Sequence, residues 1–394
     1  MKFAAKNGDG YYLGESRLKK HTVLLAVLIL GLTISAQELQ HESVAINIEV
    51  PVRVYDGAKF VGDLTIENFE LYENGVLQTI DAVYLINKTS TQREESRVDT
   101  QDNKKIFSPK LSRQFVLIFE VREVFAEVEK AIWHFFDNVL IPSDKLIVAT
   151  PLKSYHFKEN SWKFVSKEEM ANQLIKRLKK DTLIRPVDWG SLDDYMNYED
   201  MNRNDMEDAF FGQRYIDEKN LLNIAEYLKS LPGQKNVFLF LQQELIDYAM
   251  PTTTSSVSDM MSGLDYLTNL SRIASFGYVS KKIKKAYADS TILFNLLYLK
   301  NNKVVTSGSM FGKIDLAGGM FGTFKDLSKI TGGLTQTTAN AADSFKKAVD
   351  ASENYYLLYY TPKNYKADGK FKRIKVKVIG QKYRIIHRTG YLAN

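Results

Sequence analysis

Residues 115–119, Phe-Val-Leu-Ile-Phe, form an unbroken apolar run, which predicts a strand that is covered on both faces. A helix is predicted directly after this run, because apolar side chains recur there at intervals of three and four and Pro142 follows. The recurring apolar positions are Val124, Val128, Ala131, Ile132, Phe135 and Val139. A buried strand followed by an amphipathic helix is the repeating unit of an α/β domain.

The same pattern continues as far as residue 351. Further strands are predicted over 145–149, 236–241 and 291–299, and helices over 167–180, 219–231, 281–289 and 341–351. Strands that alternate with helices predict a parallel sheet joined by right-handed crossovers. The expected fold class is therefore α/β, a doubly wound, mostly parallel sheet of Rossmann-like architecture.

Both flanks of this region have β character instead. Short alternating runs near the N-terminus are separated by turn dipeptides such as Asp56-Gly57 and Asn74-Gly75, and the tail predicts a small three-stranded meander over 355–360, 371–379 and 383–387. We expect these N- and C-terminal strands to pack together as a small β domain, because neither set is large enough to be stable alone. The expected domains are an N-terminal β segment (44–86), a polar linker (87–112), the α/β domain (113–352) and a C-terminal β segment (353–394).

Residues 1–36 are predicted to be a signal peptide. The apolar run 22–34 follows Lys19 and Lys20 and leads into the small residues before Gln37, where we expect the mature chain to begin. An uncleaved anchor is the alternative, and it would be the chain's only membrane contact. Bases directly after Leu18 favour Leu18 as an alternative translation start. The protein is therefore expected to be exported, to the periplasm, the medium or the cell surface.

Composition excludes several classes of function. The chain has no cysteine, so it has neither a disulfide nor a thiol nucleophile. Outside the predicted signal peptide, 48 Lys and Arg side chains face 45 Asp and Glu. This balance argues against a protein built to neutralise the phosphates of a nucleic acid.

No catalytic motif is complete. Residues 307–314 fail the phosphate-loop pattern at both ends, so the glycines between 308 and 322 are interpreted as a flexible surface loop. The five histidines are not spaced as metal ligands, and no nucleophile elbow is present. Residues 187–219 hold ten acids among aromatic residues, which favours a solvated insertion that contacts a partner over a calcium loop. Nine bases within 366–388 favour a lysine-lined sheet face over binding of anionic glycans.

Four groups of segments, in order along the chain, resemble the secreted bacterial VWFA-related proteins, a family with a von Willebrand factor type A-like domain. The first is Val50-Pro-Val-Arg-Val-Tyr-Asp-Gly57 with residues 64–78, and the second is Leu231-Pro-Gly-Gln-Lys-Asn-Val-Phe-Leu239. The third is Thr331-Gly-Gly333. The fourth is the tail, with Tyr355-Tyr-Leu-Leu-Tyr-Tyr-Thr-Pro362, residues 368–371 and Thr389-Gly-Tyr391.

The resemblance implies a metal-ion-dependent adhesion site at the carboxyl ends of the parallel strands, where open α/β sheets bind ligands. The family's Asp-x-Ser-x-Ser motif falls here on Glu120, Arg122 and Val124, with Glu123 between the last two. The later aspartate falls on Gln243, flanked by Gln242 and Glu244, and Thr182 is the candidate for the threonine. Because two hydroxyl ligands are missing and a cation has been added, we expect this site to be degenerate and to bind no metal. One hypothesis is that Arg122 replaces the ion and pairs with Glu120 or Glu244. The alternative is that these are solvated loop charges.

We therefore expect an exported, non-enzymatic, adhesion-type module that binds a protein partner through the rim residues Glu120, Arg122, Glu123, Val124, Thr182, Gln242, Gln243 and Glu244. No catalytic residue, metal, cofactor or nucleic-acid partner is predicted, and the oligomeric state is left open. The alternatives are a structural component of a cell-envelope assembly and a periplasmic hydrolase that uses rim carboxylates such as Glu120, Glu123 and Glu244.

Overall fold

The computed structural model describes residues 46–97, 107–157, 161–183, 218–249, 281–289, 291–300, 311–315, 317–380 and 382–393. All of them belong to the compact unit that spans residues 46–394. The predicted signal peptide, the Leu18 start and nearly all of the acidic segment 187–219 lie outside the described residues. None of the helices in the described part of the chain is both long enough and apolar enough to cross a membrane.

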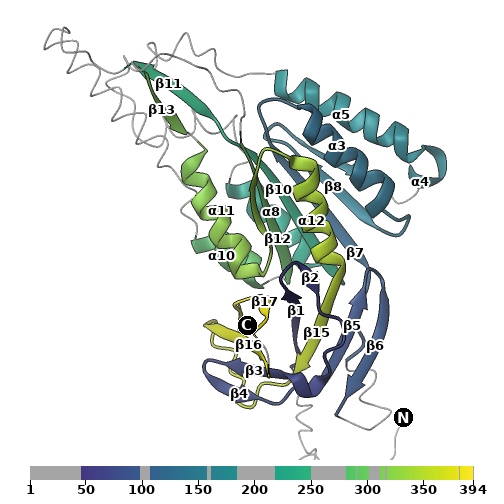
Figure 1. Ribbon diagram of the computed structural model, residues 1–394, viewed down its shortest axis with the longest axis vertical. Coiled ribbons are helices and arrows are strands. Elements are labelled where there is room, and N and C mark those ends of the chain that lie inside the picture. Colours follow the sequence, from purple (N-terminus) through teal and green to yellow (C-terminus); the bar gives the residue numbers. More distant parts are fainter. Residues whose placement is uncertain are drawn as a thin grey trace, which may run out of the picture. The chain divides into compact units, whose positions relative to one another are not determined.

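The middle part of the sequence forms a six-stranded mixed sheet (Figure 1). Its strands, in spatial order, are β14 (Thr335–Thr338), β12 (Ile292–Leu299), β10 (Gln234–Gln242), β7 (Arg113–Glu120), β8 (Lys145–Ala149) and β9 (Ser154–Phe157). The first five run parallel and β9 is antiparallel to β8. Every residue of β7 and β12 is buried, as the apolar run 115–119 predicts.

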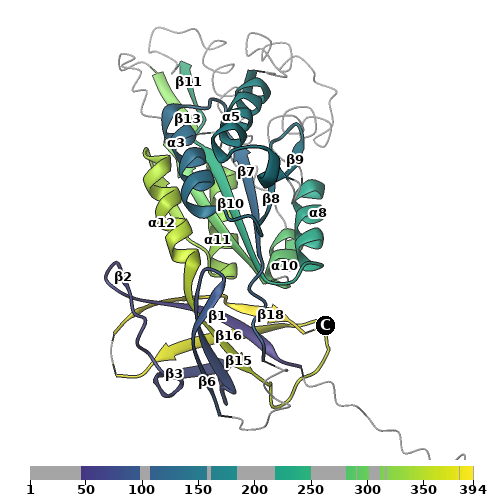
Figure 2. The same ribbon diagram turned by 90° about the vertical axis from the view of Figure 1, so that its right-hand side faces the viewer.

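Helices cover both faces of this sheet (Figures 1 and 2). Phe115, Leu117 and Phe119 face one way and pack with residues of α3 (Ala126–His134), its π-helical extension η2 (Phe135–Val139), α5 (Lys167–Leu183) and α12 (Ala341–Glu353). Val116 and Ile118 face the other way and pack with residues of α8 (Glu218–Lys229), α10 (Lys281–Asp289) and α11 (Gly318–Thr331). The short helix α4 spans Ser161–Phe164. The alternation along β7 is the two-residue period of a strand with a core on each face.

Strands from the two ends of the chain pair with one another. The N-terminal elements are β1 (Ile48–Asp56), β2 (Lys59–Phe60), η1 (Ile66–Asn68), β3 (Phe69–Glu73), β4 (Val76–Gln78), β5 (Ala82–Asn87) and β6 (Ser90–Ser96). The C-terminal strands are β15 (Asn354–Tyr360), β16 (Phe371–Val378), β17 (Arg384–His387) and β18 (Gly390–Leu392). One sheet has the order β17-β1-β15-β5-β6, with β2 paired to β1, and another has the order β18-β16-β3-β4. Side chains from both sheets share one hydrophobic core.

The predicted fold class is wrong. A doubly wound, mostly parallel α/β protein of the von Willebrand type A kind would hold its strands mainly in one parallel sheet. The described residues instead form four sheets, and ten of their fourteen strand pairings are antiparallel. The alternation of strands and helices on which the prediction rested holds only for the middle of the chain.

Three local predictions also differ from the structure. The tail is not a meander, because β15, β16 and β17 each pair with an N-terminal strand. Residues 90–96, within the expected linker, form β6 against β5. Part of the expected glycine loop is ordered: β13 (Phe311–Asp315) pairs with β11 (Leu245–Ala249), and α11 begins at Gly318. The proposed domain boundaries themselves stay predictions.

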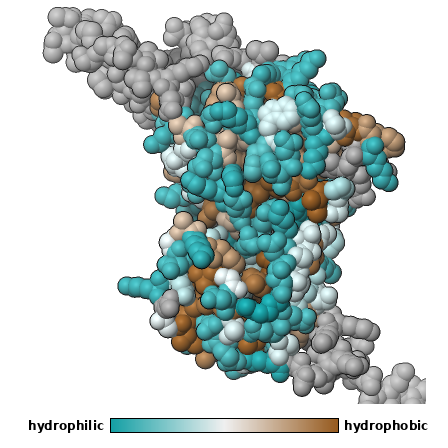
Figure 3. All heavy atoms as spheres, turned by 45° about the vertical axis from the view of Figure 1, so that its right-hand side comes forward, coloured by the Kyte–Doolittle hydropathy of each residue, from teal (hydrophilic) through white to brown (hydrophobic). Residues whose placement is uncertain are grey.

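The surface of the molecule is consistent with apolar side chains being gathered in its cores. Figure 3 shows a face that is mostly hydrophilic, with hydrophobic side chains in smaller groups, several of them at the level of the terminal strands. In β16, Arg373, Lys375 and Lys377 are exposed and alternate with the buried Ile374 and Val376. This alternation agrees with the interpretation of the basic tail as a lysine-lined sheet face.

Candidate functional site at the carboxyl ends of β7 and β10

The structure brings together seven of the eight predicted site residues. Glu120 is the last residue of β7 and lies beside Leu241 of the parallel neighbour β10. Arg122, Glu123 and Val124 follow in the loop before α3, while Gln242, Gln243 and Glu244 end β10 and lead into β11. Because carboxyl ends of parallel strands meet at one edge of a sheet, the two loops form a common rim.

Gln242 fixes the loop that follows β7. Its side-chain oxygen accepts hydrogen bonds from the backbone N–H groups of Arg122, at 2.7 Å, and Glu123, at 3.2 Å. Gln242 is buried, so these bonds also satisfy an amide oxygen that is shielded from water. The backbone of the β7–α3 loop is thus held to the end of β10.

Arg122 and Glu244 form an ion pair across the rim. The distance from Arg122 Nη2 to Glu244 Oε2 is 3.0 Å, and the side chains are 29% and 11% exposed. Of the two carboxylates considered from sequence as partners of Arg122, the structure therefore pairs it with Glu244. A pair this close to solvent contributes about 0–1 kcal/mol to stability.

The remaining loop residues divide between core and surface. Glu120 is buried at the strand end, and Glu123 is exposed. Val124 is buried and belongs to the core cluster between the sheet and α3. Val124 therefore serves packing, although the resemblance placed it at a ligand position.

Sequence reasoning missed Asp315, the last residue of β13. Its carboxylate accepts hydrogen bonds from the Glu244 N–H at 3.2 Å, the Ala317 N–H at 3.0 Å, the Gln243 amide at 3.2 Å and the Tyr298 hydroxyl. Burial, and then this contact with Asp315, raise the pKa of Tyr298. The available signal was an aspartate in a glycine-rich turn region, since Asp side chains often accept the backbone N–H two residues further on, as Asp315 does from Ala317. The sequence analysis interpreted the glycine-containing segment around Asp315 as a surface loop and therefore did not consider this aspartate.

Within the described residues, Thr182 forms no hydrogen bond to the other predicted site residues. It lies near the end of α5, and its hydroxyl donates to the Lys179 carbonyl of the same helix at 2.9 Å. The neighbouring Asp181 makes the contacts between elements instead: it accepts from the Tyr155 hydroxyl at 2.7 Å and pairs with Lys153 at 3.1 Å. The threonine alignment therefore selected a residue whose hydrogen bond is local to its helix.

The chemistry of the rim is that of a fixed, mixed-charge surface. Arg122 offers a partly exposed guanidinium, Glu123 an exposed carboxylate, and the Asp315 carboxylate is surrounded by four donors. Within the described ranges, no group of three or more His, Cys, Asp or Glu side chains could hold a metal ion. The expectation of a metal-free site stays a prediction.

Comparisons with known proteins give little further guidance. No family model matches the chain, and no curated protein matches it. Among solved structures, the human COPII-coat protein Sec24c matches with a TM-score of 0.32 and 6% sequence identity. The match covers 73% of this chain and 44% of Sec24c, so the chain spans less than half the length of that protein. The comparison shows a remote likeness only.

Proposed function

We propose that this chain is an exported, non-enzymatic protein-binding module of the adhesion type, distantly related to the secreted bacterial VWFA-related proteins. Its contact surface is the rim around Arg122, Glu123 and Glu244. The observation that supports this proposal best is the Arg122–Glu244 ion pair, which lies where the resemblance implies a metal ion. An ion pair across the rim replaces recognition through a metal with recognition through side-chain charges.

The backbone beneath these charges is fixed in advance. Gln242 holds the loop after β7, and Asp315 holds the backbone after β10 through the Glu244 N–H. A surface that is ordered before binding loses less conformational entropy when a partner docks. Loops that display charges from a rigid sheet are a common basis for recognition.

The same contacts favour binding over hydrolysis. General acid–base catalysis needs a carboxylate that can exchange a proton with a substrate. Glu244 is engaged by a guanidinium, and Asp315 accepts four hydrogen bonds. Carboxylate oxygens that are engaged in this way are less available to meet a proton of a substrate, so the arrangement suits charge display better than catalysis.

A structural role in an envelope assembly is the second candidate, and a separate surface favours it. Val76 and Leu77 of β4 are 60% and 52% exposed. β4 is the last strand of the sheet ordered β18-β16-β3-β4. Exposed apolar side chains on an edge strand favour association with another chain.

A capture experiment tests the proposal and separates the two candidates. The mature chain from Gln37 is immobilised and exposed to an envelope extract of the source cells, once with chelator and once with calcium, and bound proteins are quantified by mass spectrometry. We expect specific capture that is equal in both arms and falls at least tenfold in Arg122→Glu and in Glu123→Lys. Glu168→Lys changes another exposed glutamate, at the start of α5, and should leave capture unchanged.

Three outcomes would contradict a rim-binding module. The first is that the immobilised chain captures no protein. The second is that capture requires calcium and is lost in Glu120→Ala, which would mean that the site holds a metal. The third is that capture survives both rim variants but is lost in Leu77→Asp, which would favour the assembly role.

A further inference from the structure

The sheet ordered β18-β16-β3-β4 has one face against the terminal core and one toward solvent (Figures 1 and 2). Along β16, Ile374 and Val376 belong to the core, whereas Arg373, Lys375 and Lys377 are exposed. Successive side chains of a strand point to opposite faces, so the three bases share the outer face of the sheet. β16 lies between β18 and β3, and protection of a sheet edge therefore does not account for its bases.

Exposed apolar side chains gather on the same sheet. Among the described residues, eight large hydrophobic side chains are exposed, and four of them lie on this sheet or directly after β16, namely Val76, Leu77, Phe371 and Ile379. Phe371 is separated from Arg373 by one residue of β16, so it faces the same way. Leu77 lies opposite Tyr72, which in turn lies opposite Lys375. Because cross-strand neighbours share a face, the outer face combines bases with apolar side chains.

The outer face has a hollow beside the turn between β3 and β4. The hollow has a volume of about 930 Å³, and its lining includes Arg373, Lys375 and Lys377 and the aromatic residues Tyr72 and Phe371. None of the described residues that line it is acidic. The hollow is therefore suited to a negatively charged group that comes from outside the molecule.

Ion pairing leaves most of this positive charge available. Lys377 is the exception, because its ammonium lies 3.7 Å from the Glu70 carboxylate and 4.6 Å from the centre of the Tyr72 ring. Neither Arg373 nor Lys375 forms an ion pair within the described part of the chain. Glu70 lies opposite Lys377 on β3, so three bases and one acid give this group of residues a net charge of +2.

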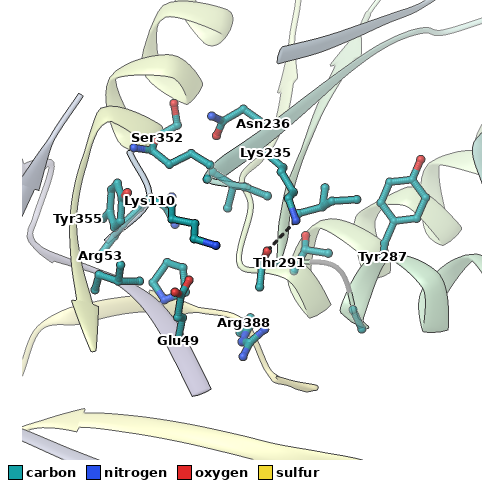
Figure 4. Close-up of a pocket in the computed structure, with 18 residues that line it drawn as sticks. Glu49, Arg53, Lys110, Lys235, Asn236, Tyr287, Thr291, Ser352, Tyr355 and Arg388 are labelled. Atoms are coloured by element: carbon teal, nitrogen blue, oxygen red, sulfur yellow. Dashed lines mark hydrogen bonds between the residues drawn. The ribbon is translucent and has the colours of Figure 1, made fainter. Parts of the chain in front are cut away.

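Another group of bases, around the cavity in Figure 4, is placed differently. Arg53 and Lys235 are buried there. Arg53 Nε donates to the Ala351 carbonyl, and Lys235 Nζ donates to the Thr291 hydroxyl at 3.3 Å. These contacts join elements within the molecule. The exposed bases of β16 are the ones that a large external surface can reach.

We propose that the outer face of this sheet binds an anionic phospholipid surface. Arg373 and Lys375 contact the phosphates of the lipid headgroups, and Phe371, Leu77 and Ile379 enter the boundary between headgroups and acyl chains. Amphipathic helices that lie on membranes combine the same two features, bases and exposed apolar side chains. A soluble acidic chain would satisfy the bases but leave the apolar side chains in water, whereas a lipid surface accounts for both.

Co-sedimentation with lipid vesicles tests this proposal. The mature chain from Gln37 is used, because the apolar run 22–34 would itself enter a bilayer. Vesicles of phosphatidylcholine are compared with vesicles of an equimolar mixture of phosphatidylcholine and phosphatidylglycerol. We expect binding to the mixed vesicles alone, and added salt should weaken it.

Variants locate the contact on the sheet. Arg373→Glu and Lys375→Glu should each weaken binding at least about fivefold, because they reverse charges that face the headgroups. Ile379→Ser should weaken it about threefold or more, because it removes an apolar side chain from the lipid boundary. The matched controls are Lys176→Glu on α5 and Phe164→Ser on α4, which change exposed side chains elsewhere and should leave binding unchanged.

Three outcomes would overturn the proposal. One is that the mixed vesicles bind no protein, and another is that Arg373→Glu, Lys375→Glu and Ile379→Ser all bind them like the wild type. The third is that soluble polyglutamate binds and the vesicles do not, which would make an acidic protein chain the partner. The three side chains are exposed, so their variants should fold, and circular dichroism checks this. The vesicles contain no protein, so the result does not depend on the rim proposal.

Discussion

The two ends of the parallel strands are built differently. At the amino ends, charged groups are buried: Arg113 begins β7 and pairs with Asp144, with side chains that are 2% and 0% exposed. At the carboxyl ends, Arg122 and Glu244 form a pair that remains partly open to water. The difference indicates that the amino ends contribute buried contacts to the fold, while the carboxyl ends leave charge accessible to solvent.

The hydrogen bonds support this division. Arg113 donates to both oxygens of Asp144, at 3.0 and 2.6 Å, and to the Val139 carbonyl at 2.8 Å. This network ties β7 to the end of η2 and to the start of β8. The Arg122 guanidinium contacts Glu244 on the loop after β10, and 29% of the Arg122 side chain is exposed to water. Three predictions test the comparison.

The largest effect is expected at the amino end. Arg113→Met should lower the free energy of unfolding by about 3–5 kcal/mol, because the Asp144 carboxylate would stay buried without its guanidinium. Urea unfolding followed by circular dichroism measures this loss. Arg122→Met is the matched control and should lose less than about 1 kcal/mol. Equal losses in the two variants would remove the distinction between the ends.

The second-largest effect is expected where a glycine lies against the backbone at the amino ends of the strands. A Cβ on Gly333 would lie 1.8 Å from the Phe294 carbonyl oxygen near the start of β12, whereas one on Gly322, near the start of α11, would have no atom within 4 Å. Gly333→Ala should therefore destabilise the protein by about 1–3 kcal/mol. Gly322→Ala should stabilise it by about 0.4–1 kcal/mol, because alanine restricts the unfolded chain. Thermal unfolding of both variants checks the signs, and a stable Gly333→Ala protein would contradict the close contact.

Two glycines, Gly233 and Gly333, account for part of the sequence resemblance. Gly233 and Gly333 belong to its quoted segments, and at both positions an added Cβ would lie within 2.5 Å of other atoms. Gly233 also has φ +85°, a conformation that favours glycine. The motifs therefore mark close backbone approaches at the amino ends of the strands, a requirement of packing that says little about function.

Local features of the fold were predictable from sequence. Asn74-Gly75 does form the two-residue turn between β3 and β4, and both residues have positive φ. The apolar run 115–119 lies within a fully buried strand. Distant strand pairing was not predictable, because the tail pattern shows alternation but carries no information on which strand lies beside β16.

The candidate site was predictable only in part. The order of elements placed Arg122 and Gln242 at one edge, but the choice of Glu244 as the partner of Arg122 depends on loop geometry across 122 residues of sequence. Asp315 was missed because β13 is short and contains a glycine, so no periodic pattern identified it as a strand. Hydrogen bonds between loops have no counterpart in local sequence patterns.

The smallest effect is expected for the rim pair itself. A double-mutant cycle with Arg122→Ala and Glu244→Ala should give a coupling energy of about 0.2–1 kcal/mol, because water screens the partly exposed charges. The coupling should decrease further as salt is added. Urea unfolding of the four proteins at low and high salt measures both quantities. A pair this weak would let Arg122 exchange Glu244 for a carboxylate of a partner at little cost, as the proposed recognition requires. A coupling above about 2 kcal/mol that salt leaves unchanged would instead make the rim a structural contact like the Arg113–Asp144 pair.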